Sequence, residues 1–236
     1  MQVCAYSEYR FSKFSHAFTA LRNMGLGGKI FGTPDGLELA KPMGAGSGNG
    51  FSIFPDFKRF AFFSVWENRS AAEQFFAESK LIHTYTERAR SGLHALLKPV
   101  RVHGLWGGGS PLRPSEPSGG TVPVAVLTRA TIRPRKLPDF WMNVPDVSSF
   151  MADADGVLYK LGVGEYPLFM QATFSIWESA ELLNRAAYGK NKAHAEVVRK
   201  TRERDWYAEE MFARFEVLDL KTLGEPHVGL SRHFSG

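Results

Sequence analysis

The sequence has one cysteine, Cys4, among its 236 residues. A single thiol excludes an internal disulfide framework, and it excludes a zinc or iron–sulfur centre held by cysteines of this chain alone. No apolar run approaches the ~18 residues that a membrane-spanning helix needs. The first residues also lack the basic and apolar regions of a signal peptide. We therefore expect a cytoplasmic protein in a reducing compartment.

An excess of one charge sign is also missing. The chain has 29 basic and 24 acidic residues, a net charge of +5. The densest basic run, residues 199–204, is interleaved with and followed by acidic residues. This pattern is typical of the solvated face of a helix, so nucleic acid is not an expected partner. The 44% hydrophobic content excludes disorder as the main state and suffices for a sizeable core.

An internal repeat organises the chain. Residues 63–67 read Phe-Ser-Val-Trp-Glu, and residues 174–178, 111 positions later, read Phe-Ser-Ile-Trp-Glu. Each copy ends an apolar run, 60–66 or 169–177, that predicts a buried strand. The repeat therefore indicates a duplicated structural unit.

The repeat extends into the segments that follow these strands. Ser70 and Ser179 are candidate N-caps for two long helices. At the same offset His83 corresponds to His194, and each histidine follows its tryptophan by 17 residues. A shared strand, helix and histidine spacing support a duplication.

The other predicted elements complete each half as β-α-β-β-α-β, the ferredoxin-like order. Pro145 is expected to divide the first helix of the second half into two short pieces. Because one face of each antiparallel sheet needs a partner, we expect the two bare faces to form a pseudo-symmetric α+β barrel within one chain. The remaining predicted segments are first strands at 2–6 and 122–132, first helices at 12–24 and 137–151, and closing strands at 100–106 and 214–220.

The composition also sets the expected boundaries. Residues 1–106 form the first half and residues 122–222 the second. Glycine, proline and serine dominate residues 107–121, as is typical of a linker. Residues 223–236 have no periodicity and are expected to form a loosely attached arm.

Several apparent motifs do not fit their chemistry. The glycine-rich segment 44–50 matches neither the dinucleotide nor the phosphate-loop pattern and is expected to be a strand connection. Cys4 is interpreted as a small buried residue. His83 and His94, placed on one helix, would lie ~16 Å apart, too far to hold one metal.

His194 is the histidine with a plausible cofactor role. It lies on the second long helix between Ala193 and Ala195. A neutral imidazole is the usual protein ligand of a haem iron, and small neighbours would admit a flat macrocycle. A packing histidine is the alternative reading. His83 has bulkier neighbours, so the second half is the expected location of a haem.

Six segments in the same order resemble the spheroidene monooxygenase family, most densely between residues 122 and 217. The resemblance implies a carotenoid oxygenase that introduces a keto group beside a conjugated polyene. It also implies haem b as cofactor and His194 as the proximal ligand of the iron. The segments are Leu127–Ile132, Phe140–Pro145, Lys160–Pro167, Gln171–Trp177, His194–Ala195 and Trp206–Phe215.

This resemblance suggests roles for five further residues. Arg129, a charge within an apolar strand, would pair with a haem propionate, with Glu165 or with another acid. Lys160 would neutralise a propionate, and Gln171 would donate a hydrogen bond to a bound ligand. Trp141 and Trp177 would pack against the porphyrin edge or simply in the core.

The expected activity is therefore a haem-dependent monooxygenation of a lipophilic substrate, with O2 and electrons from a donor such as a ferredoxin. Such a substrate also implies contact with a membrane surface. Two alternatives remain open: a haem enzyme of the same fold that acts on a small nitrogenous or peroxide substrate, and a non-catalytic haem-binding protein. The sequence leaves assembly into a homo-oligomer open.

Overall fold

The architecture comes from a computed structural model of the whole chain. It describes residues 1–48, 52, 54–150, 154–166, 168–188, 201, 203–224 and 230, with only the backbone described for 144–150 and 188. The first half contains β1 (Val3–Phe11), α1 (Phe14–Gly25), η1 (Gly27–Phe31), β2 (Leu37–Gly46), β3 (Pro55–Trp66), α2 (Arg69–Glu78), α3 (Lys80–Arg88) and β4 (Ala89–Gly104). The second contains β5 (Val124–Ile132), η2 (Pro134–Lys136), α4 (Leu137–Phe150), β6 (Val157–Tyr166), β7 (Met170–Trp177), α5 (Ala180–Tyr188) and β8 (Tyr207–Gly224).

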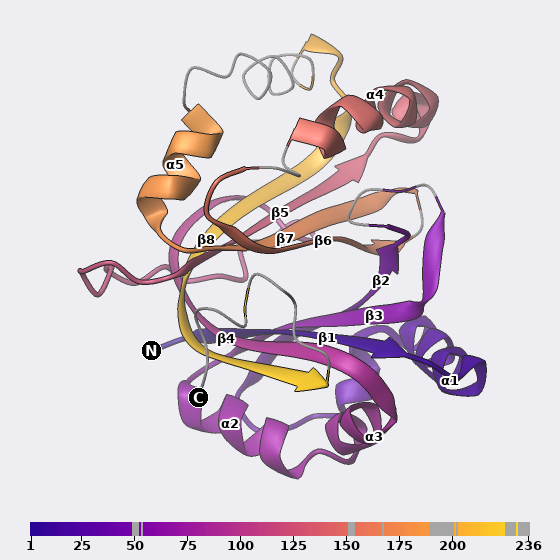
Figure 1. Cartoon of the computed structure of the whole chain (residues 1–236), viewed down its shortest axis with the longest axis vertical. Helices are drawn as coiled ribbons and strands as arrows, with labels where there is room; N and C mark the ends of the chain where they lie inside the picture. The colour runs from indigo at the N-terminus through magenta and orange to yellow at the C-terminus, as the bar shows by residue number, and fades with distance from the viewer. Residues whose placement is uncertain are drawn as a thin grey trace.

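The strands form one closed antiparallel barrel in the order β1-β3-β2-β6-β7-β5-β8-β4. The first half supplies β1 to β4, and the second half supplies β5 to β8. Figure 1 shows α1, α2 and α3 against the outside of the lower sheet, and α4 and α5 beside the upper sheet. The expected α+β barrel of two ferredoxin-like halves is therefore confirmed.

The helix ends differ in part from the expectation. Asn68, not Ser70, caps α2, and its side chain accepts a hydrogen bond from the Ala71 amide at 3.0 Å. Ser179 does cap α5, since its hydroxyl accepts from the Leu182 amide at 3.2 Å. The expected long helix of the first half is interrupted at Ser79, whose extended backbone separates α2 from α3.

Two further sequence predictions are wrong. α4 runs unbroken through Pro145, so this proline removes one backbone donor without dividing the helix. β4 begins at Ala89, eleven residues before the expected closing strand, so His94 lies on a strand and not on a helix. Strand pairing along β1 explains that extension, since Phe11 lies opposite Ala89.

Among the described residues, no helix has the length and apolar character needed to cross a bilayer.

The inside of the barrel is filled by apolar side chains from both halves. Tyr6 stacks on Phe174 with ring centroids 3.7 Å apart, and its hydroxyl lies 3.4 Å from that of Tyr159. All three side chains are buried. Alternate residues of each strand face this core, as the two-residue period of a strand requires. The interior therefore joins the two halves by packing.

The two seams between the halves differ in length. β4 and β8 pair from Ser91–Gly224 to Gly104–Met211, with register shifts at Leu96/Leu97 and Pro99/Arg101. β2 and β6 pair only at Gly44–Gly164 and Ala45–Val163. Figure 1 shows β8 running from the upper sheet into the lower sheet.

Residues 107–121, the expected linker, contact the barrel closely. Leu112 is buried in the barrel core, and the Ser118 amide and hydroxyl both donate to Glu216, at 2.7 Å each. The tail also differs from a loose arm at the two places described. β8 extends to Gly224, and Leu230 packs in the barrel core with 1% exposure.

Candidate functional site

The outer faces of the two sheets are equivalent surfaces that carry different side chains. The strand register defines the equivalence, because Val3 lies opposite Trp66 and Val124 opposite Trp177. Counting from these pairs, Tyr9 on β1 corresponds to Ala130 on β5. Likewise the Phe-Ser-x-Trp repeat matches residues of β3 to residues of β7.

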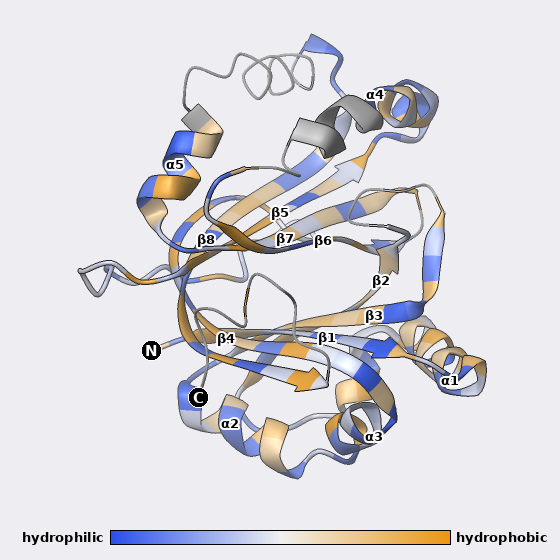
Figure 2. Cartoon of the chain, in the orientation of Figure 1, coloured by the Kyte–Doolittle hydropathy of each residue, from blue (hydrophilic) through white to orange (hydrophobic). Residues whose placement is uncertain are grey.

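Aromatic side chains and helices cover the outer face of the first half. Phe62 is 2% exposed and lies beneath Phe31 and Tyr85, with ring centroids 5.2 and 5.0 Å away. Tyr9 and Phe60 are buried in the same cluster. The hydropathy colouring in Figure 2 shows hydrophobic residues along much of the lower sheet that these helices cover.

The second half has smaller or polar residues at the matching positions. Ala130, Gln171 and Thr173 stand where the first half has Tyr9, Phe60 and Phe62. Two separate apolar clusters occupy the ends of this face, one around Trp177 and Leu183 and one around Phe140 and Trp206.

Thr128 shows how the covering of the outer sheet face differs between the two halves. Its counterpart Ser7 is fully buried and bonds to His94, whereas Thr128 is exposed. Thr128 and Thr173 lie side by side in the register of β5 and β7. We call the surface formed by Thr128, Ala130, Lys160, Gln171 and Thr173 the candidate face.

Lys160 and Gln171 lie on the candidate face, as strand alternation requires. Lys160 pairs in register with Ser175, and Gln171 pairs with Ala130 and with Gly164. The Gln171 amide nitrogen lies 3.5 Å from the Tyr166 carbonyl oxygen. Both side chains are partly exposed, so each can reach a ligand on this face.

The two predicted tryptophans lie at opposite ends of the candidate face. Trp177 is fully buried, and its indole nitrogen donates to the Ser175 hydroxyl at 2.9 Å. Trp66 makes the same bond to Ser64 at 2.8 Å in the first half. This repetition supports a packing role for Trp177. Trp141 on α4 is partly exposed and donates to the Leu168 carbonyl oxygen at 3.3 Å.

Arg129 points to the inner side of the barrel, away from the candidate face. It is 3% exposed and pairs in register with Met211 and Ala172, both members of the barrel core. Its guanidinium forms an ion pair with Glu209, and Nε lies 3.6 Å from a carboxylate oxygen of Glu165. Arg129 therefore pairs with protein carboxylates, which are among the partners expected from the sequence.

These acids belong to a charged cluster around Trp106. The Trp106 indole donates to Glu165 at 2.7 Å, and Lys41 Nζ lies 2.8 Å from the other oxygen of Glu165. Lys41 and Arg129 both stand over the Trp106 ring, at 5.7 and 5.8 Å from its centroid. Two cations, two carboxylates and an indole therefore contact one another beside the barrel core, and Arg129 Nε has no hydrogen-bond partner among the described residues.

Glu209 is held in its charged form within this cluster. Burial alone would raise the pKa of the carboxyl. The Gly107 and Gly108 amides donate to it at 2.9 and 2.6 Å, and with Arg129 they hold its pKa below the ordinary value. Sequence patterns alone do not single out Lys41, Trp106 or Glu209. For Lys41 and Glu209 the signal in the sequence is a charge at a strand position that alternates with core residues.

His194 lies outside the described residues, so its predicted role stays a prediction. Its counterpart His83 lies on α3 with an exposed side chain, and Nε2 is 2.7 Å from the Ala77 carbonyl oxygen. The His83 side chain on α3 therefore reaches back to the end of α2.

The candidate face fits a flat macrocycle in one respect that the structure can test. A haem that lies between a sheet and a helix needs a sheet surface without bulky side chains, which would otherwise occupy the same volume. Ala130 and Thr173 provide such a surface, while Tyr9 and Phe62 fill the first half. A single axial imidazole is sufficient to hold haem, so the absence of a cluster of three or more potential metal ligands among the described residues does not count against it.

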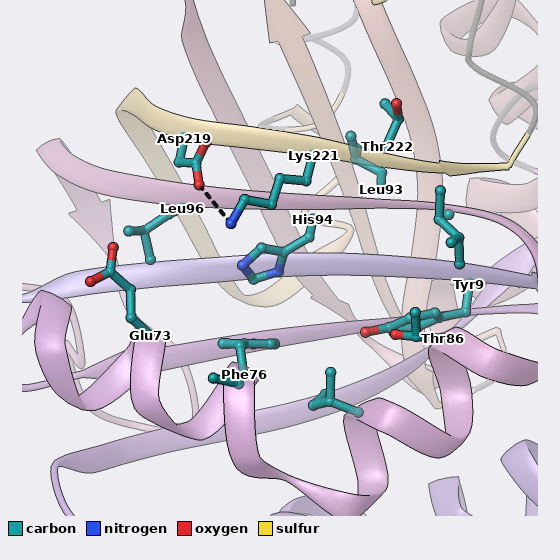
Figure 3. Close-up of a pocket in the computed structure, with 14 residues that line it drawn as sticks. Tyr9, Glu73, Phe76, Thr86, Leu93, His94, Leu96, Asp219, Lys221 and Thr222 are labelled. Carbon is teal, nitrogen blue, oxygen red and sulfur yellow. Dashed lines mark ion pairs between the residues drawn. The ribbon is translucent and has the colours of Figure 1, made fainter. Parts of the chain in front are cut away.

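Figure 3 shows a pocket of about 500 Å³ in the first half. It lies between the sheet and the helix pair α2–α3, and its lining is largely apolar. Lys221 Nζ and Asp219 form an ion pair at 3.4 Å at its upper edge. None of the residues predicted for the site lines this pocket.

His94 is one of the titratable groups that line that pocket. Nδ1 lies 2.9 Å from the Ser7 hydroxyl, and the ring is 4.2 Å from that of Phe76, centroid to centroid. Burial, together with the Lys221 ammonium, lowers the pKa of His94 to about 4. The imidazole is therefore neutral at physiological pH and serves the packing of α2 on the sheet.

Comparison with known proteins adds close relatives in sequence. The chain is 33% identical over 221 residues to a spheroidene monooxygenase of Rhodobacter capsulatus, covering 92% of this chain and 91% of the relative. It is 32% identical over 218 residues to a spheroidene monooxygenase of Cereibacter sphaeroides, covering 92% and 67%. No family model matches the sequence.

Solved structures agree on the fold. An aldoxime dehydratase crystallised with butyraldoxime superposes with a TM-score of 0.62 at 12% identity, covering 98% of this chain and 85% of that one. A second aldoxime dehydratase structure gives the same TM-score at 13% identity. At such low identity the likeness concerns the barrel architecture alone.

Proposed function

This chain belongs to the spheroidene monooxygenase family, and from that premise we propose that it oxygenates a carotenoid with O2 and electrons from an external donor. The relatives in Rhodobacter capsulatus and Cereibacter sphaeroides carry that activity in their names. In each round one oxygen atom enters a C–H bond of the substrate and the other leaves as water, with two electrons and two protons supplied. Two rounds at the same methylene carbon give a gem-diol, which loses water to leave the keto group. A reduced ferredoxin is a donor of the required chemical class.

We propose further that the reaction takes place over the candidate face of the second half. The single observation that supports this placement is the exchange of Tyr9, Phe60 and Phe62 for Ala130, Gln171 and Thr173 at equivalent positions. Among the described residues, stacked aromatic and other apolar side chains fill the barrel interior. A polyene and a cofactor both need apolar surface that the protein's own aromatic residues do not already cover.

Haem b is the proposed cofactor, with His194 as its protein ligand. A bound haem supplies the redox centre at which dioxygen is reduced. The chain's own residues would position it: Lys160 would pair with a propionate, and the small surface at Ala130 and Thr173 would admit the ring. Gln171 would orient a polar atom beside the ring through its amide N–H.

Water exclusion is the other contribution of the chain. The apolar clusters around Trp177 and Phe140 border the candidate face at its two ends. An apolar border keeps competing water from the reacting carbon and favours a hydrocarbon substrate. Trp141 extends this border beside the β6–β7 turn through its bond to Leu168.

Two measurements test this proposal. The purified protein should show a Soret band after reconstitution with haem, and expression in a bacterium that accumulates the unoxygenated carotenoid should yield the keto product. Loss of the keto product in a strain that carries His194→Ala would support His194 as the protein ligand of the haem. Unchanged carotenoids with the intact gene would refute the activity, and a keto product from a protein that binds no haem would refute the cofactor.

A further inference from the structure

One helix of the first half exposes apolar side chains in a regular pattern. On α1, Phe14, Phe18 and Leu21 are exposed at i, i+4 and i+7, which places them on one stripe of the helix. Ala17 and Ala20 form the adjacent stripe, which is buried against the sheet. The helix is therefore apolar toward both the protein and the solvent.

The exposed stripe continues into neighbouring segments. Leu26 follows α1 directly, Phe54 immediately precedes β3, and Phe57 is the third residue of β3, which rises beside α1 in Figure 1. We call these six residues the α1 surface. Their exposed fractions are 66% for Phe14, 59% for Phe18, 41% for Leu21, 55% for Leu26, 68% for Phe54 and 53% for Phe57.

The charged residues on and next to α1 are all basic, and the acidic residue within the α1 surface is Asp56, which lies between Phe54 and Phe57. No aspartate or glutamate occurs between Arg10 and Pro34. Within and beside this interval five basic residues are exposed: Arg10, Lys13, Arg22, Lys29 and Lys58. An apolar helix face with a basic rim is the pattern of a helix that lies in the headgroup region of a membrane.

We propose that the α1 surface docks on the surface of an anionic lipid bilayer. The apolar side chains would enter the boundary between headgroups and acyl chains, and the basic rim would pair with lipid phosphates. The charge pattern argues against a second copy of the chain as occupant. A two-fold dimer through this surface would bring the same basic rim against itself.

The second half contributes apolar residues at the same end of the barrel. β1 ends before α1 and β5 ends before α4, and Figure 1 shows both helices on one side of the molecule. Met142 on α4 is 74% exposed, and Tyr166 and Leu168 in the β6–β7 turn are 65% and 40% exposed. If the proposed function holds, a carotenoid leaving the bilayer would meet this turn next to the candidate face.

Vesicle flotation with the full chain, without haem or carotenoid, tests the docking. We expect the protein to float with vesicles in which phosphatidylglycerol is about a third of the lipid, and to float weakly with phosphatidylcholine alone. Added salt should release it, because the ionic part of the attraction is screened. This readout does not depend on the oxygenase reaction, so its outcome is separate from that of the proposed function.

Matched variants locate the surface. Phe14→Ser with Phe18→Ser should weaken vesicle binding at least about tenfold, whereas Phe14→Leu with Phe18→Leu should retain it. Lys13→Gln with Arg22→Gln should weaken binding to the anionic vesicles by about twentyfold. The control pair Lys80→Gln with Arg185→Gln removes the same charge from α3 and α5 and should bind as the wild type.

Circular dichroism melting should be unchanged in all four proteins, since the altered side chains are exposed. The proposal is overturned if the wild type does not float with anionic vesicles, or if the serine variant floats as well as the leucine variant. It is also overturned if the serine variant converts a dimer to a monomer in sedimentation while vesicle binding stays absent, because the occupant would then be a second copy.

Discussion

Thr173 on β7 and Phe62 on β3 occupy equivalent positions on the two halves of the barrel, yet only Phe62 is buried beneath its helices. Phe62 contacts Phe31 and Tyr85 and thereby fixes η1 and α3 to the sheet. Thr173 is partly exposed. The duplication has therefore kept the barrel core in both copies while giving the two outer faces different uses.

This relationship predicts that Thr173→Phe will close the candidate face. The phenyl ring would occupy the volume proposed for the cofactor, and overpacking of this kind costs about 1–3 kcal/mol. Haem affinity should fall by roughly 10- to 100-fold in a haem titration followed by absorbance, while the melting temperature of the apo-protein stays close to wild type. Thr121→Phe places the same ring on an exposed loop residue and should leave haem binding unchanged.

His194→Ala should remove most haem binding while the fold survives, as judged by the Soret band and by circular dichroism. His83→Ala is the matched control, because His83 is exposed and its ring contacts the Ala77 carbonyl group. A loss of folding stability in His194→Ala with an unchanged haem spectrum would identify a packing histidine. A larger haem loss in His83→Ala would move the cofactor to the first half.

Arg129→Leu should destabilise the apo-protein by about 2 kcal/mol, because it removes the cation shared by the partly buried carboxylates of Glu165 and Glu209. Urea unfolding measures this change. Arg133→Leu removes an arginine whose pair with Asp205 is largely exposed, so its cost should stay below about 1 kcal/mol. Haem affinity should remain near wild type, since Arg129 faces the barrel core. A drop in haem affinity with unchanged apo-protein stability would instead assign Arg129 to the cofactor.

His94 predicts a loss of stability in mild acid. Its pKa is about 4 in the folded protein, against 6.5 for an ordinary histidine. The unfolded chain therefore gains a proton before the folded chain does as the pH falls. The stability that neutral His94 contributes is present above pH 6.5 and is lost progressively toward pH 4, at most about 3 kcal/mol.

The measurement is urea unfolding of wild type and His94→Gln at several values between pH 7 and pH 4. The difference between the two proteins isolates His94 from the carboxylates that also titrate in acid. The groups that face it, Asp219 and Lys221 on β8, are the same in both proteins. A constant difference across this range would contradict the assignment. His83→Gln should track the wild type.

The duplication made the barrel predictable from sequence, because the Phe-Ser-x-Trp repeat fixed both the strand type and the offset between halves. Local signals were weaker. Asn68 and Ser70 are both good capping residues, and the structure distinguishes them because Asn68 has an extended backbone and α2 begins at Arg69. The strand β4 was underestimated, because Ser91 and Gly92 interrupt its apolar pattern while pairing with β1 still holds them in the sheet.

For the candidate site, it is harder to predict from the sequence which side of the sheet each strand residue faces. Arg129 and Gln171 both looked like polar residues in apolar strands, and the sequence assigned both to a cofactor. The register separates them, since Arg129 faces the barrel core with Glu209, while Gln171 faces outward. A one-residue shift reverses the side of every side chain, so this distinction required the pairing of β5 with β7 and β8.

The two halves are joined by a long β4–β8 ladder on one side of the barrel and by only two residue pairs, Gly44–Gly164 and Ala45–Val163, between β2 and β6 on the other. Because local unfolding begins where the fewest hydrogen bonds hold the structure, the barrel should open first between β2 and β6. Amide hydrogen exchange should therefore be faster at Ala45 and Val163 than at Ala95 and Leu220 in the β4–β8 ladder.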